Sequence, residues 1–218
     1  MIVTAGKRRA QAACFLSVLA FFCANSPLHT LHAEDAGLAE QMLAQCLHRA
    51  ERTPDETLAQ AEQWLKQGGG DRARLCRAFA QFHGGDTIFA AQEFAALAAA
   101  RDKTDRKHAA SLYTQAGLAY MRANDHKNAE VAYGKALILE PQDPEMWLDR
   151  ATERAAVERF WDAIDDLNRA LDIMPDMIDA LRLRGQAWTK LGQESKARAD
   201  FERAAMLEAA EGVTPSPP

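Results

Sequence analysis

From residue 110 onward, apolar residues recur three and four positions apart in stretches separated by short polar or small-residue segments. In the first pair, these stretches cover residues 110–122 and 126–139, with Ala123-Asn124-Asp125 between them. Apolar residues at this spacing form a stripe along one face of an α-helix, and each stretch has the length of an average helix. The pattern therefore predicts pairs of amphipathic helices joined by short turns.

The paired pattern returns with a period of about 34 residues up to the C-terminal region. Small residues are expected where two helix backbones approach closely, and large apolar residues fill the space beside them. A proline after the second helix ends it, because proline has no N–H to continue the hydrogen-bond ladder. The recurring residues are Tyr113, Trp147 and Leu181; Gly117, Ala151 and Gly185; Ala129, Ala163 and Ala197; Tyr133, Leu167 and Phe201; Ala136, Ala170 and Ala204; and Pro141 with Pro175.

In both period and residue types, the pattern resembles the tetratricopeptide repeat (TPR) family. The resemblance covers three units, residues 110–143, 144–177 and 178–211. It implies an all-α fold, a TPR-like α-solenoid in which antiparallel helix pairs stack and share one continuous core. The sequence departs from the family pattern at Arg150 and Arg154, and Ala209 stands where a third closing proline would fall.

Residues 34–107 carry a weaker version of the pattern. Ala78, Ala90 and Phe94 occupy core positions of an earlier unit, and two further helical patterns precede it at residues 36–51 and 54–67. We interpret residues 34–107 as divergent helical repeats, although a simple capping hairpin is an alternative for the first two helices. The C-terminal residues 212–218, GVTPSPP, are predicted to be a disordered tail.

Residues 1–33 have the features of a cleavable secretory signal peptide. A basic start (Lys7, Arg8 and Arg9) is followed by an apolar run at residues 12–24 and by Ala33, after which we place the cleavage. The apolar run is shorter than the roughly 20 residues of a membrane span, although an uncleaved N-terminal anchor is the alternative. The sequence therefore predicts a periplasmic or secreted bacterial protein that has no membrane contact once the signal peptide is removed.

The charge balance argues against nucleic acid as a partner. The formal net charge is −5, and it becomes −8 once residues 1–33 are removed, because that segment contributes three basic residues and no acidic one. Nucleic-acid affinity depends mainly on clustered Lys and Arg.

Cys46 and Cys76 are the cysteines that remain after cleavage, and in an oxidising compartment they could form a disulfide. Two buried free thiols are the alternative, and the sequence leaves this choice open.

Recognisable catalytic chemistry is missing from the sequence. It has no metal-binding or nucleophile motif and no glycine-rich phosphate loop, so we expect no metal, no cofactor and no small-molecule substrate. His108 and His126 lie in charged or turn segments and are interpreted as solvated. The carboxylates at positions 162, 165 and 166 are interpreted as partners of Arg159 and Arg169 in ion pairs on a helix surface.

By resemblance to the TPR family, the first helix of each unit lines a concave groove that binds a protein or peptide. We therefore predict a non-catalytic interaction scaffold, and charge reversal at Arg182 and Lys190 is expected to abolish partner capture. The alternatives are a cell-envelope enzyme whose site lies in residues 34–107, and a membrane-anchored assembly factor. The predicted groove residues are Thr114, Leu118, Met121, Arg122, Leu148, Thr152, Arg182, Gln186, Thr189 and Lys190.

Overall fold

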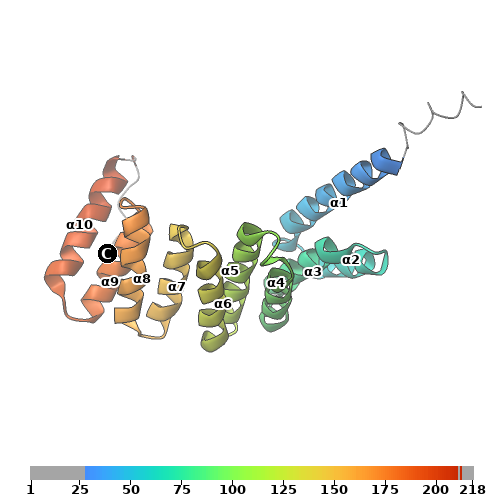
Figure 1. The fold of residues 1–218 in the computed structure, drawn as a ribbon. Helices are drawn as coiled ribbons and strands as arrows, with labels where there is room; N and C mark the ends of the chain where they lie inside the picture. Colours follow the sequence, from blue (N-terminus) through green and yellow to red (C-terminus); the bar gives the residue numbers. More distant parts are fainter. Residues whose placement is uncertain (1–27, 211, 213–218) are drawn as a thin grey trace, which may run out of the picture. The chain divides into compact units, whose positions relative to one another are not determined.

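The computed structural model describes residues 28–210 and 212, with side chains from residue 37 onward. This part of the chain contains ten α-helices and no strand, which confirms the predicted all-α fold (Figure 1). Residues 1–27 of the predicted signal peptide and the tail from 213 lie outside the described residues. The helices are α1 (Leu28–Ala50), α2 (Pro54–Lys66), α3 (Gly70–Gly84), α4 (Thr87–Arg101), α5 (Arg106–Arg122), α6 (His126–Leu139), α7 (Pro144–Ala156), α8 (Phe160–Ile173), α9 (Ile178–Lys190) and α10 (Glu194–Ala210).

The chain divides into two units, Met1–Glu40 and Gln41–Pro218. The described part of the first unit is the beginning of α1. In the second unit, each helix from α2 to α10 packs against the next helix along the chain, as the colour order in Figure 1 shows. In addition, α5 contacts α7 and α7 contacts α9. Alternate helices therefore share one side of the stack, as in an α-solenoid. Within the described residues, no helix is both long enough and apolar enough to cross a membrane.

The helices begin where the sequence supplies N-terminal caps. The side chains of Asp86, Asp105, Asp125 and Asp143 each accept a hydrogen bond from a backbone N–H in the first turn of the following helix. Such a cap satisfies one of the N–H groups that have no partner inside the helix. Pro144 occupies the first turn of α7, where a missing N–H costs nothing.

The turns within the pairs α3–α4, α5–α6, α7–α8 and α9–α10 share one backbone conformation. Gly85, Asn124, Glu158 and Gly192 all have positive φ, at 96°, 57°, 62° and 70°. Glycine and asparagine are the residues that adopt this left-handed region readily, whereas a glutamate there is strained by about 1 kcal/mol. The α7–α8 turn therefore keeps a strained, exposed carboxylate where the other pairs have Gly or Asn.

The core depends on complementary sizes within each clear repeat. A Cβ placed on Gly117 would lie 2.7 Å from the ring of Tyr133, and a Cβ on Gly185 would lie 2.7 Å from the ring of Phe201. In the middle unit, the equivalent positions hold Ala151 and the smaller Leu167, both fully buried. In each pair, the small residue of the first helix lies against a large side chain of the second helix, and the size of that side chain sets how closely the two helices approach.

We expect Gly117→Ala to destabilise the protein by about 1–3 kcal/mol, because the methyl group overlaps the Tyr133 ring. The better helix propensity of Ala offsets about 0.5–1 kcal/mol of this cost. Adding Tyr133→Leu recreates the pairing of Ala151 with Leu167, so the double variant should lose less stability than the two single variants together. Urea unfolding followed by circular dichroism measures the free energy of unfolding of the two single variants and of the double variant. Strict additivity would contradict the size-matching explanation.

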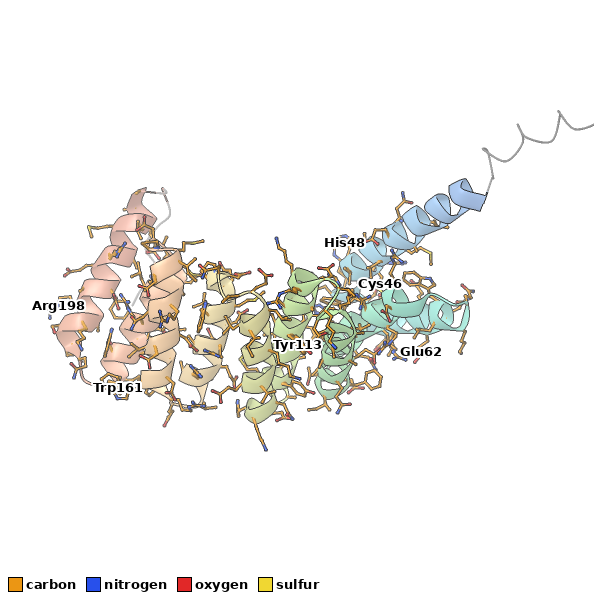
Figure 2. All side chains as sticks on the ribbon, viewed as in Figure 1. Cys46, His48, Glu62, Tyr113, Trp161 and Arg198 are labelled. Carbon is orange, nitrogen blue, oxygen red and sulfur yellow. A yellow bond between two sulfur atoms is a disulfide. The ribbon has the colours of Figure 1, made fainter. Side chains whose placement is uncertain are left out.

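Cys46 of α1 and Cys76 of α3 form a disulfide (Figure 2). Their Cα atoms are 5.8 Å apart, within the usual range for a disulfide. Both residues are almost completely buried, and they belong to the same apolar cluster as Leu43 and Leu75. The disulfide therefore fastens the end of α1 to the repeat stack.

Candidate interaction site

The predicted groove residues occupy α5, α7 and α9, the helices that contact one another along one side of the stack. Thr114, Leu148 and Arg182 are each one repeat period apart, so they stand at the same place in successive units. Five of the ten are exposed and five are half-buried. The exposed residues are Arg122, Thr152, Gln186, Thr189 and Lys190, and the half-buried ones are Thr114, Leu118, Met121, Leu148 and Arg182.

Leu118 and Leu148 pack against the two apolar core clusters, and each still has part of its side chain at the surface. The hydroxyls of Thr152 and Thr189 donate to the carbonyls one turn before them, at 2.9 and 3.0 Å. The middle of the predicted groove is therefore built from neutral side chains of moderate size. Such a surface suits apolar or uncharged residues of a partner.

Two of the three basic residues in the predicted set have structural contacts. Arg182 donates to Glu208 at 3.0 Å, and these two side chains are only 18% and 7% exposed. The Arg122 guanidinium lies 4.1 Å from the centre of the Phe82 ring, in a cation–π contact. Reversing the charge of Arg182 would bury two carboxylates side by side. That variant would disturb the fold, so it cannot isolate the effect on partner binding.

A buried Arg–carboxylate pair inside the repeats was missed by the sequence interpretation. Arg150 donates to both oxygens of Asp166 at 2.9 and 2.7 Å, and Arg184 does the same to Asp200 at 2.8 and 2.6 Å. Arg77 and Glu93, at 3.1 Å, form a further pair with the same 16-residue separation. The sequence contains a signal for these pairs. Arg150 and Arg184 stand at equivalent positions of successive repeats, and so do their partners Asp166 and Asp200.

The interpretation of the acidic residues at 162, 165 and 166 as helix-surface groups was therefore wrong for Asp166. This residue is 2% exposed, and Arg154 binds it in addition to Arg150. Arg159 does pair with Asp162 at 2.7 Å, as expected. Arg169 instead lies 3.9 Å from Asp172, a surface contact. Spacing along one helix cannot reveal a partner on the neighbouring helix.

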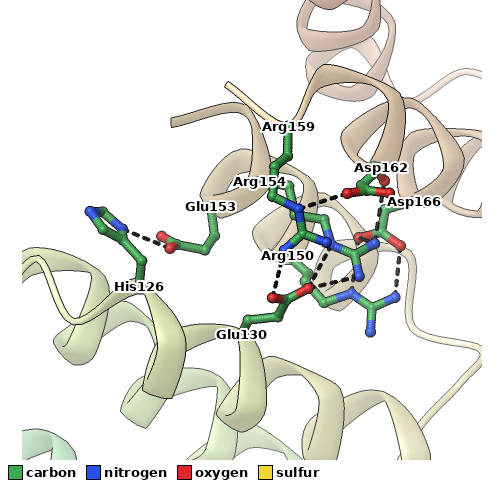
Figure 3. Close-up of polar contacts among 8 residues, drawn as sticks. All are labelled: His126, Glu130, Arg150, Glu153, Arg154, Arg159, Asp162 and Asp166. Carbon is green, nitrogen blue, oxygen red and sulfur yellow. Dashed lines mark hydrogen bonds and ion pairs between the residues drawn. The ribbon is translucent and has the colours of Figure 1, made fainter. Parts of the chain in front are cut away.

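Ion pairs also join the unit of α5 and α6 to the unit of α7 and α8 (Figure 3). Glu130 on α6 accepts from Arg154 at 3.0 Å and from Arg159 at 2.7 Å. Burial alone would raise the pKa of Glu130, but the hydrogen bonds from the two arginines outweigh it and lower the pKa.

Nearby, His126 contacts the buried Glu153 at 2.8 Å, so the interpretation of His126 as merely solvated was incomplete.

Asp149 on α7 carries a half-buried carboxyl group. Burial raises its pKa to about 6, and the neighbouring carboxylates of Glu145 and Asp143 add to the shift. The charged form is therefore less stable in the folded protein than in the unfolded chain.

We expect Asp149→Asn to stabilise the fold at pH 7.5 by about 2 kcal/mol, since the variant avoids holding a carboxylate in this environment. The folded-state pKa is raised, so the wild type loses stability as the pH rises from about 4 to about 6. The advantage of the variant should disappear below pH 4, where both states of the wild type are protonated. Urea unfolding at pH 7.5 and pH 3.5 tests this, with the exposed Asp165→Asn as control. An equal effect at both pH values would contradict it.

In the described part of the chain, no group of His, Cys, Asp and Glu side chains could hold a metal ion. The fold instead defines a class of protein, the α-solenoids built from stacked helix pairs. A family model described as tetratricopeptide repeat matches residues 110–143. The chain thus carries the tetratricopeptide repeat, and its fold is that of the TPR proteins.

Solved structures show the same fold. A crystal structure of MamA protein has a TM-score of 0.64 and 17% sequence identity, and the match covers 81% of this chain and 95% of that chain. The structure of MamA from residue 41 to its end, from Desulfovibrio magneticus RS-1, has a TM-score of 0.66 and 18% identity, with coverage of 81% and 96%. At this identity the likeness concerns the fold alone. Among curated proteins, no match to the sequence was found.

Proposed function

We propose that this protein is a non-catalytic interaction scaffold of the bacterial cell envelope, which holds a peptide or partner protein against the inner helices α5, α7 and α9. The TPR fold supports a role in protein–protein interaction. The observation that carries the proposal is the surface formed by the predicted groove residues on these three helices, which we call the inner face. Equivalent positions on the first helices of three successive repeats present partly exposed, mostly neutral side chains, among them Leu118, Leu148 and Thr152.

The chemistry of this face favours an apolar partner segment. Leucine side chains anchored on the core offer apolar contact area, and the exposed Gln186 offers an amide for hydrogen bonding. An amphipathic helix or an extended peptide could lay its apolar side chains along such a surface. The scarcity of unengaged cations among the predicted groove residues does not favour capture of a terminal carboxylate.

Two features support an envelope location. Residues 1–33 have the pattern of a signal peptide, and the Cys46–Cys76 disulfide is of a kind that persists in oxidising compartments such as the periplasm. Export followed by signal cleavage is therefore part of the proposal.

Affinity capture from an envelope extract tests the groove, with residues 34–218 as bait. Thr152→Arg/Gln186→Arg places two bulky cations on exposed inner positions and should abolish capture of a specific partner. The matched control, Gln92→Arg/Ala199→Arg, makes the same change on exposed positions of α4 and α10 and should capture normally. Equal capture by both folded variants would overturn the groove assignment.

A further inference from the structure

A pocket of about 270 Å³ lies where the start of α6 meets the end of α7 and the following turn. Its lining includes His126, Lys127, Glu130, Glu153, Arg154 and Arg159. None of these residues belongs to the predicted groove, so the pocket is a separate feature of the repeat junction.

Glu153 is the unusual member of this lining. Its side chain is only 2% exposed, and its Oε1 atom lies 2.8 Å from Nδ1 of His126. Its Oε2 atom is buried and has no hydrogen-bond partner. A buried carboxylate oxygen without a donor is costly, so this atom would gain from one more N–H donor.

The neighbouring arginines cannot supply that donor. Arg154 binds Glu130 and Asp166, and Arg159 binds Glu130 and Asp162. In Figure 3, the Glu153 carboxylate points toward His126 and away from this arginine cluster. Across the junction, the arginines at 150, 154 and 159 pair with the carboxylates at 130, 162 and 166, which leaves Glu153 without an arginine partner.

The turn at the edge of the pocket carries a further carboxylate. Val157 and Arg159 line the pocket, and Glu158 between them is exposed and has a positive φ of 62°. The equivalent turns use Gly or Asn, so an exposed carboxylate is kept here despite the strain.

We propose that this pocket binds a lysine or arginine side chain of a partner protein, with Glu153 as the counter-ion. The His126 side chain is 40% exposed, so it can swing outward and leave both carboxylate oxygens to an incoming guanidinium. Lys127 also lines the pocket and repels such a ligand. This proposal does not depend on the groove, because the two surfaces share no residue.

The probe is N-acetyl-L-arginine amide, and its neutral analogue N-acetyl-L-citrulline amide is the control at matched ionic strength. In the full chain, the arginine probe should raise the melting temperature above the citrulline value and shift the amide NMR signals of residues 126–130 and 153–159. Glu153→Gln should remove this difference. Lys127→Ala should bind the arginine probe severalfold more tightly. An equal response to both probes in the wild type would overturn the proposal.

His126→Ala provides a second test that remains valid even if Glu153→Gln does not fold. Without the imidazole, the buried Glu153 loses its hydrogen-bond partner, so the variant should melt at a lower temperature than the wild type. The arginine probe should then restore more of the lost melting temperature than the citrulline probe does. Equal recovery with the two probes would show that Glu153 does not accept a cation from outside.

Discussion

Arg184→Ala is expected to lower the free energy of unfolding by about 3 kcal/mol, because it leaves the buried carboxylate of Asp200 without its cation. The arginine makes both hydrogen bonds to Asp200 and a third to Asn168 at 2.8 Å. The side chains of Arg184 and Asp200 are 21% and 9% exposed, so water can replace only part of the hydrogen bonding that Asp200 loses. Urea unfolding at pH 7 measures the effect.

The matched control is the double variant Arg184→Ala/Asp200→Ala. Residues 110–143 hold alanine at both equivalent positions, Ala116 and Ala132, and both are buried. The double variant should therefore lose clearly less stability than the sum of the two single variants, because no unpaired charge stays buried. A cost below about 1 kcal/mol for Arg184→Ala would contradict the assigned role of the pair.

Replacing both bonded cysteines, in Cys46→Ala/Cys76→Ala, is expected to cost about 3–4 kcal/mol in the segment that they enclose. The two residues are separated by 30 positions, and the chain-entropy model gives a cost of this size for opening such a loop. In a repeat stack, a helix pair is stabilised mainly by its neighbours, so the loss should be local. Hydrogen exchange should become faster in α2 and α3 and stay unchanged in α9 and α10.

The control for this prediction is the wild-type protein in excess dithiothreitol after unfolding and refolding. It should show the same local increase in exchange as the double cysteine variant. An equal increase in every helix would show that the disulfide does not act on the N-terminal segment alone. No change at all would show that packing around Leu43 and Leu75 suffices without the disulfide.

Periodicity could predict the fold because it reports burial. Ala129, Ala163 and Ala197 recur at one place, where a buried helix contact admits only a small side chain, and all three are buried. The repeat period likewise indicated close contact at Gly117 and Gly185, which the structure shows against Tyr133 and Phe201. Residue size and spacing alone therefore predicted these core contacts.

Polar contacts were much harder to predict. Arg150 and Arg154 looked like departures from the repeat pattern, yet both bind Asp166 on the next helix. Arg182 looked like an exposed groove residue, yet it pairs with Glu208, which is 26 positions away. Charged residues are usually exposed, so a sequence pattern favours a solvated interpretation. Only three-dimensional contacts reveal where a long arginine side chain reaches a buried carboxylate.

We propose that the inner face of α5, α7 and α9 holds a partner protein. Site-specific photo-crosslinking in the native host tests it most directly, with benzoylphenylalanine at Thr152 or Thr189 on the inner face and at Gln92 or Ala199 on the second helices. We predict that the same partner is crosslinked from Thr152 and Thr189 and is absent from the other two. Adducts formed only from Gln92 and Ala199, or equally from all four positions, would contradict the claim.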